Sequence, residues 1–290
     1  MSEAIETPSG KGAGDENFPV GSWLLPARLR PHVAVFYRFA RAIDDIADNP
    51  ALAPADKIAR LARFEAALLG HEGADPALAT ATRMRGSLAE TGVTTRHCRD
   101  LIAAFKQDAT KPRYRDWADL MGYCELSANP VGRYLLDLHG EHSSGYPAAD
   151  GLCSALQVLN HLQDCQDDRR ALDRVYVPLD WLSEAGLDVA AIDAASSSPA
   201  LRRVLDRCLD GVDDLLAVAR DLPARLTSRH LAMESAVIFR LAERLTALLR
   251  AGDPLAGRVG LRRRDFAACG LRGAGGELWR RLLGSAWPGR

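Results

Sequence analysis

The sequence has no excess of charge of either sign, and its cysteines do not occur at paired spacing. Its 290 residues include 37 Lys and Arg against 38 Asp and Glu, which leaves a formal net charge of −1. Without an overall basic field, the chain has little to attract a nucleic-acid backbone, so we expect no nucleic-acid partner. The cysteines occur singly, without the C-x-x-C spacing of zinc sites or redox pairs, and we expect reduced, mostly buried thiols. They are Cys98, Cys124, Cys153, Cys165, Cys208 and Cys269.

Long apolar runs are also missing. No stretch approaches the roughly 18 uninterrupted apolar residues that span a bilayer, because charged residues interrupt each one. Residues 1–17 are polar and glycine-rich and lack the basic flank and apolar run of a signal peptide. We therefore expect a disordered leader over residues 1–17, a single domain over residues 18–290, and a cytoplasmic protein.

Alternating runs of Val, Ile and Thr are absent, whereas apolar residues recur at helical spacing along most of the chain. Hydrophobic residues make up 47% of the sequence, which is enough for a sizeable core. The connections are short and no repeat is present, so we predict an all-α, single-domain bundle. The predicted helices cover residues 31–48, 55–69, 76–91, 95–107, 117–139, 150–170, 199–219 and 229–251.

Four polar residues form one stripe on the first of these helices. Tyr37, Arg41, Asp44 and Asp48 follow one another at intervals of three or four residues, whereas Asp45 lies beside the stripe, about 100° around the helix. Carboxylates one turn apart repel each other, and more so when they are removed from water. The same helix also carries apolar surface, so its acidic face requires a compensating cation. The apolar residues are Phe36, Phe39, Ile43 and Ile46.

A second segment repeats this pattern with Gln157, Asn160, Asp164 and Asp168 at helical spacing. Magnesium is typically held by one or two carboxylates together with substrate phosphates. We therefore predict that the four aspartates of the two stripes hold Mg²⁺ and that the substrate carries a diphosphate. The alternative is that each stripe is a solvated helix face paired with nearby arginines. The presence of two such stripes, with other polar residues in register, favours the metal site.

The two motifs resemble those of the squalene/phytoene synthase family, the head-to-head prenyl synthases. The motifs are Tyr37-x-x-x-Arg41-x-x-Asp44-x-x-x-Asp48 and Gln157-x-x-Asn160-x-x-x-Asp164-x-x-x-Asp168, and the resemblance extends over residues 17–271. It implies an isoprenoid-synthase-type helical bundle around a central cavity. The acidic helices would lie at the mouth of this cavity, with magnesium between them and apolar walls below.

Within the family, segments 16–20, 127–132 and 172–178 are similar to those of the hydroxysqualene synthases of bacterial hopanoid pathways. This similarity implies ionisation of presqualene diphosphate and capture of the cation by water, giving hydroxysqualene and diphosphate. One alternative is a synthase that makes presqualene diphosphate, squalene or phytoene from two prenyl diphosphates. Another is an inactive assembly or scaffold relative. A head-to-tail elongase or terpene cyclase is disfavoured by the Gln157 and Asn160 register.

The resemblance also implies roles for individual residues. Arg41 and Arg174 would bind diphosphate oxygens, Tyr37 would face the cation, and Gln157 and Asn160 would orient water. The residues expected to contact the prenyl chains are Phe18, Ala128, Val131, Gly132 and Leu135, with Val158 and Leu162 as further candidates for the wall. Relatives often carry serines around residues 16–20 and a Gly-Arg pair where this chain has Asp173-Arg174.

The C-terminal region combines basic and aromatic residues. The run Arg262–Arg264 is followed by Trp279, Arg280, Arg281, Leu282, Leu283 and Trp287. Such a segment is either a solvated face or a peripheral contact with an anionic membrane, here the inner face of the bacterial membrane. The family resemblance adds functional coupling to other hopanoid-pathway enzymes as a further expectation.

Overall fold

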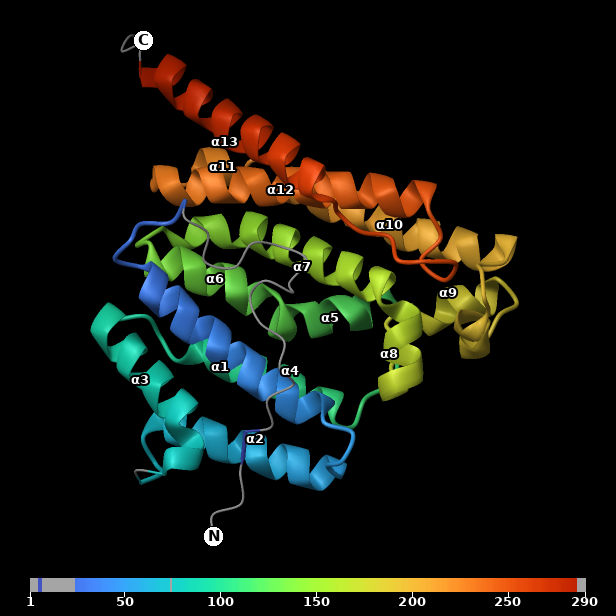
Figure 1. The fold of residues 1–290 in the computed structure, drawn as a ribbon, viewed down its shortest axis with the longest axis horizontal. Coiled ribbons are helices and arrows are strands. Elements are labelled where there is room, and N and C mark those ends of the chain that lie inside the picture. The colour runs from blue at the N-terminus through green and yellow to red at the C-terminus, as the bar shows by residue number, and fades with distance from the viewer. Residues whose placement is uncertain (1–4, 7–23, 74, 286–290) are drawn as a thin grey trace.

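The computed structural model describes residues 5–6, 24–73 and 75–285, and these residues form a helical bundle that contains no β-strand (Figure 1). The all-α prediction is therefore confirmed. The α-helices are α1 (Arg30–Asp48), α2 (Pro54–Leu69), α3 (Ala79–Thr91), α4 (Arg96–Asp108), α5 (Trp117–Ser127), α6 (Asn129–Leu138), α7 (Tyr146–Gln163), α8 (Cys165–Leu172), α9 (Leu179–Glu184), α10 (Pro199–Ala219), α11 (Leu222–Arg225), α12 (Arg229–Ala251) and α13 (Arg263–Ser285).

The prediction of one helix over residues 117–139 was wrong. α5 ends at Ser127 and α6 begins at Asn129, with Pro130 in its first turn. A proline is accepted in the first turn because its missing N–H would have no intrahelical partner there, whereas in a helix interior it removes a hydrogen bond. The chain therefore changes direction at Ala128.

The helix predicted over residues 150–170 is also broken, at Asp164. The backbone N–H of Asp164 still donates to the Asn160 carbonyl at 3.0 Å, and that of Asp168 donates to the Asp164 carbonyl at 2.8 Å. Asp164 itself has non-helical backbone angles, so α7 ends before it and α8 begins after it. Figure 1 shows α8 turned away from the α7 axis.

The core lies between two groups of helices. α7 packs against α6, α10 and α12, while α1 packs against α2, α3 and α4. The apolar face predicted for the first helix is buried in this core, since Phe39, Ile43 and Ile46 have no exposed surface. Burial of this apolar face fixes the rotation of α1 about its own axis, and with it the direction in which the acidic stripe points.

Three elements were not predicted: α9, α11 and the long C-terminal helix α13, which packs along α12 (Figure 1). In α13, glycines at 270, 273, 275 and 276 lower the intrinsic helix propensity, so the local sequence alone does not favour a helix. None of the helices in the described part of the chain combines the length and apolar character that crossing a bilayer requires.

All six cysteines are free thiols, and five of them are buried. The predicted domain boundary at residues 17–18 lies outside the described residues. Ile5, within the expected leader, is buried, and its carbonyl accepts a hydrogen bond from Arg60 Nη1 at 3.3 Å. The disordered leader and its boundary therefore stay predictions.

Candidate active site

The C-terminal end of α1 and the α7–α8 junction bring the two acidic motifs together. The pKa of Asp168 is raised to about 7, mainly by burial and then by the negative charges of Asp164 and Asp48. The contribution from Asp48 shows that carboxylates of the two motifs lie near each other, although they are 120 residues apart in sequence. The bend at Asp164 turns α8 and allows this approach.

Asp44 lies one turn earlier on α1 and has a raised pKa of about 8. Burial is the main cause, followed by repulsion from Asp48, while Arg41 opposes both effects. The Arg41 guanidinium pairs with the Asp44 carboxylate through Nη2 and with Asp45 Oδ1 through Nε at 3.0 Å. One cation is thus shared between two carboxylates.

Arg174 supplies a second cation and is 6% exposed. Its Nη1 donates to Asp48 Oδ1 at 2.5 Å and its Nη2 to the Ala47 carbonyl at 3.2 Å, so the segment after α8 is tied to the end of α1. Lys57 Nζ donates to the same carbonyl at 2.7 Å. Burial and the charge of Arg174 lower the pKa of Lys57.

A cavity of about 360 Å³ extends from this acidic region into the bundle. Five predicted residues line its polar part: Tyr37, Arg41, Asp44, Gln157 and Asn160. The remaining wall is mostly apolar and includes three residues predicted to contact a prenyl chain: Ala128, Val131 and Leu135. Polar groups of both motifs therefore line a cavity whose wall is otherwise mostly suited to hydrocarbon.

Other predicted site residues do not line this cavity. A Cβ atom on Gly132 would lie 2.7 Å from Cys153 Sγ and 3.4 Å from Ala149 Cβ, which places Gly132 at the contact between α6 and α7. Val158 and Leu162 are buried in the core. The residues that lie beyond the cavity wall at the acidic junction are Asp48, Asp164, Asp168 and Arg174. Phe18 lies outside the described residues.

The structure adds a buried polar and aromatic cluster that sequence reasoning missed. Tyr123 donates its hydroxyl hydrogen to Asp108 Oδ2 at 2.6 Å, and the ring of His161 stacks on Tyr176 with centroids 3.4 Å apart. His161 Nε2 also lies 3.1 Å from Gln157 Nε2. Asp108, Tyr123, His161 and Tyr176 come from four separate segments, so no local spacing identifies them.

Burial strongly shifts the pKa values of two residues in this cluster, Asp108 and His161. The pKa of Asp108 rises to about 7, mainly because burial disfavours its charge. The pKa of His161 falls to about 3 because of burial and the charge of Arg174. His161 is therefore neutral at physiological pH and can accept or donate a hydrogen bond beside Gln157.

Glu234 on α12 also lines the cavity and is 5% exposed. Together with Asp44 it supplies the acidic groups of this wall, but it belongs to neither acidic motif. Its position was not predictable, because a single glutamate on an amphipathic helix normally faces solvent.

The donor atoms of the acidic junction are carboxylate oxygens, which suit a hard divalent cation. Within the described residues, no group of three or more His, Cys, Asp or Glu side chains is placed to hold a metal ion by itself. Magnesium commonly keeps waters and shares one or two carboxylates with substrate phosphates, so two opposed carboxylate pairs fit that mode of binding. A bound divalent cation would favour the ionised forms of Asp44 and Asp168, whose pKa values burial raises.

Comparison with known proteins gives concordant results. The chain is 42% identical to the hydroxysqualene synthase of Rhodopseudomonas palustris, with 98% of this chain and 96% of that protein covered. It is 40% identical to the hydroxysqualene synthase of Sinorhizobium fredii, with 93% and 91% covered. The crystal structure of squalene synthase HpnC from Alicyclobacillus acidocaldarius matches with a TM-score of 0.70 at 31% identity, over 80% of this chain and 87% of that one.

A dehydrosqualene synthase crystallised with a ligand has a TM-score of 0.74, over 91% of this chain and 92% of that one. At 18% identity this match shows a common fold alone. The squalene/phytoene synthase family matches residues 12–265, which include both acidic motifs, Tyr123 and Arg174. The chain belongs to the squalene/phytoene synthase family.

Proposed function

We propose that the protein is a hydroxysqualene synthase that ionises presqualene diphosphate and directs water to the resulting cation. The observation that carries this proposal is the cavity, in which Arg41, Asp44, Gln157 and Asn160 of the two motif helices share a wall that is otherwise mostly apolar. A long isoprenoid diphosphate has the same division between a charged end and a hydrocarbon body. The relatives named hydroxysqualene synthase, similar along nearly their whole length, support the specific reaction.

In this proposal the carboxylates of Asp44, Asp48, Asp164 and Asp168 hold Mg²⁺ at the mouth of the cavity. Bound magnesium would neutralise the charge that develops on the departing diphosphate. Arg41 and Arg174 have planar guanidinium groups that donate to phosphate oxygens, and both already lie beside the acidic carboxylates.

The reaction breaks the carbon–oxygen bond to the diphosphate, which leaves with both electrons of that bond. The apolar wall, including Ala128, Val131 and Leu135, keeps bulk water from the cation while its carbon skeleton rearranges. Tyr37 presents an aromatic ring to the cavity. One water molecule, oriented by Gln157 and Asn160, then adds to the cation and releases a proton, which gives the alcohol.

The decisive experiment supplies presqualene diphosphate and Mg²⁺ to the purified protein without nicotinamide, and the apolar products are identified by mass. Hydroxysqualene and inorganic diphosphate in equal amounts are the expected products. An untouched substrate would contradict the proposal. If farnesyl diphosphate were consumed instead, the protein would be a synthase that joins two prenyl diphosphates, the second candidate, which membership of the same family favours.

The metal ligands are tested by replacing Asp48 or Asp164 with Asn and measuring diphosphate release at saturating Mg²⁺. We expect each change to slow release by about a hundredfold or more, because charge neutralisation in such sites is worth several kcal/mol. Asp167→Asn is the matched control, since Asp167 is exposed on α8 beside Asp168. Near-normal turnover in both ligand variants would refute the metal site. Inactivity of the wild type with every prenyl diphosphate would favour the scaffold alternative.

We place the enzyme in the cytoplasm with peripheral contact at the inner face of the membrane. Its proposed substrate and product are long isoprenoids, which partition into lipid. Functional coupling to other hopanoid-pathway enzymes would follow from a shared membrane surface, because an apolar product would pass between enzymes without crossing water.

A further inference from the structure

The outward face of α13 carries a line of exposed apolar side chains. Leu271 is 79% exposed, Leu278 50%, Trp279 64% and Leu282 56%. Their spacing of seven, one and three residues places them on one side of the helix. We call these four residues the apolar stripe. Within the described residues, Val218 on α10 is the only other large apolar side chain with comparable exposure, so such surface is concentrated on one helix.

The acidic and basic residues of α13 differ in exposure. Its acidic residues, Asp265 and Glu277, are buried against the bundle, at 7% and 5% exposure. Asp265 Oδ1 accepts a hydrogen bond from Arg244 Nε at 2.9 Å, and Glu277 is paired with Arg280 and Arg281. Within the described residues, the exposed charged side chains of α13 and of the residue before it are all basic. They are Arg262, Arg263, Arg264, Arg272 and Arg280.

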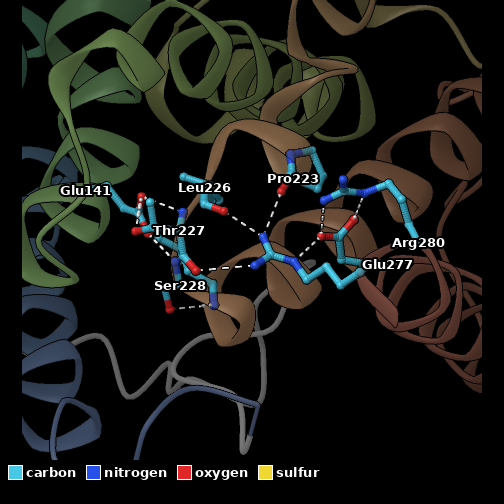
Figure 2. A network of polar contacts seen from close by, with 9 residues as sticks. Glu141, Pro223, Leu226, Thr227, Ser228, Glu277 and Arg280 are labelled. Atoms are coloured by element: carbon cyan, nitrogen blue, oxygen red, sulfur yellow. Dashed lines mark hydrogen bonds and ion pairs between the residues drawn. The ribbon is translucent and has the colours of Figure 1, made fainter. Parts of the chain in front are cut away.

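Contacts with the α11–α12 turn fix the orientation of the stripe. The Arg281 guanidinium donates to the carbonyls of Leu226 at 2.6 Å, Pro223 at 3.3 Å and Thr227 at 3.3 Å (Figure 2). Arg281 Nε also donates to Glu277 Oε1 at 2.5 Å. One side chain thus satisfies three backbone acceptors, one in α11 and two in the turn that follows it, and holds α13 in place.

A second contact brings the α13 and α12 backbones together. A Cβ atom on Gly273 would lie 2.8 Å from the Val237 backbone, so only glycine permits this approach. Because both contacts lie on the inner side of α13, the apolar stripe faces away from the bundle. It cannot turn inward without losing these interactions.

We propose that the apolar stripe and its flanking arginines bind the surface of an anionic lipid bilayer. Leucine side chains would enter the boundary of the acyl chains, Trp279 would lie at the headgroup level, and the arginines would contact lipid phosphates. A second copy of the chain fits this face poorly, because a symmetric contact would oppose exposed arginines without an exposed carboxylate to pair them. The proposal deepens the proposed function by naming the surface that meets the membrane.

The test measures sedimentation of the full chain with vesicles in the absence of substrate. Vesicles of phosphatidylcholine and phosphatidylglycerol in equal parts are compared with phosphatidylcholine alone. We expect binding to the anionic vesicles that weakens at high salt. The double variant Leu271→Ser/Leu278→Ser should reduce partitioning by about tenfold or more, because two apolar side chains no longer enter the lipid. Val218→Ser is the matched control, since it removes an exposed apolar side chain from α10, and it should bind like the wild type.

We call the double variant Leu271→Ser/Leu278→Ser the stripe variant. Equal vesicle binding by the stripe variant and the wild type would overturn the proposal, as would equal binding of the wild type to neutral and anionic vesicles. Sedimentation velocity without lipid tests whether a second copy of the chain covers the apolar stripe. A dimer that the wild type forms and the stripe variant does not would assign this face to a second copy and overturn the proposal. Turnover of detergent-dispersed presqualene diphosphate is measured separately and should be unchanged in the stripe variant. A failure of that reaction in the wild type would refute the proposed function and leave the vesicle result standing.

Discussion

Asp173 adopts backbone angles that most side chains avoid, and it directly precedes the buried Arg174. Its φ is 52° and its ψ 32°, in the left-handed region where glycine is strain-free and Asp or Asn is tolerated. Arg113 Nη2 pairs with Asp173 Oδ1 at 2.6 Å, Arg169 pairs with the same oxygen, and Arg113 Nη1 donates to the Asp173 carbonyl. These arginines hold the residue in a conformation that directs Arg174 toward Asp48.

Asp173 is therefore expected to be a positioning residue for Arg174. Asp173→Ala should cost about 1–2 kcal/mol of unfolding free energy, because alanine is strained in this region, and should raise the substrate KM. Asp173→Gly keeps the backbone angles without strain, so its KM should remain near that of the wild type.

A double-mutant cycle separates positioning from general destabilisation. In an Arg174→Ala background, Asp173→Ala should have no further effect on KM, although it should still lower the unfolding free energy measured in urea. Equal KM values for Asp173→Ala and Asp173→Gly would show that the backbone conformation does not position Arg174.

The sequence predicts some of the site residues and misses others for a physical reason. Tyr37, Arg41 and Asp44 share a face of one helix, so their spacing alone brings them to one surface. Asp108 and Tyr123 meet because α4 and α5 pack together, which depends on contacts far along the chain. The left-handed conformation of Asp173 is likewise stabilised by arginines 4 and 60 residues away in sequence.

At the scale of elements, periodicity identifies long helices but not where tertiary contacts divide them. α10 and α12 begin and end at the predicted residues, because each carries a serine cap before an uninterrupted amphipathic pattern. The α5–α6 and α7–α8 breaks lie among polar residues, Ser127 and Asn129 at the first and Gln163 and Asp164 at the second, where hydrophobic periodicity does not mark the end of a helix. Helix α13 owes its place to contacts with α11 and α12, which its glycine-rich sequence does not indicate.

The contact between α6 and α7 yields a prediction about the cavity wall. Gly132→Ala would place a methyl group 2.7 Å from Cys153 Sγ, and Cys153 lines the cavity. We expect this overpacking to lower the unfolding free energy by about 1–2 kcal/mol and to displace Cys153. Because alanine also favours a helix by up to about 1 kcal/mol over glycine, the single variant reports the sum of two opposed effects.

The Cys153→Ala background isolates the steric effect. There the clash is removed, and Gly132→Ala should be neutral or stabilising in urea unfolding. Additive effects of the two substitutions would mean that the close approach of α6 and α7 does not depend on the absence of a side chain at position 132.

At the scale of the whole molecule, buried carboxylates make stability depend on pH. The native pKa values of Asp44, Asp108 and Asp168 are raised from 3.8 to between about 7 and 8, principally by burial. Between the unfolded and native values, the folded state binds more protons than the unfolded chain, so the unfolding free energy falls as pH rises. Below about pH 6.5 the lowered pKa values of His139 and His161 act in the opposite direction, because these histidines gain protons on unfolding.

The carboxylates should therefore dominate between about pH 6.5 and 8.5, where we expect the metal-free protein to lose on the order of 3 kcal/mol of unfolding free energy. Urea unfolding at several pH values measures this loss. Magnesium with inorganic diphosphate should offset it, and the stabilisation should be larger at the upper end of the range, where the carboxylates are ionised and can act as ligands. The variant Asp44→Asn/Asp168→Asn removes two of the three groups, so it should show a flatter pH profile and little response to the metal. A wild-type stability that does not decline over this range, or a variant that declines as steeply, would contradict the placement of these carboxylates in a site that is largely removed from water.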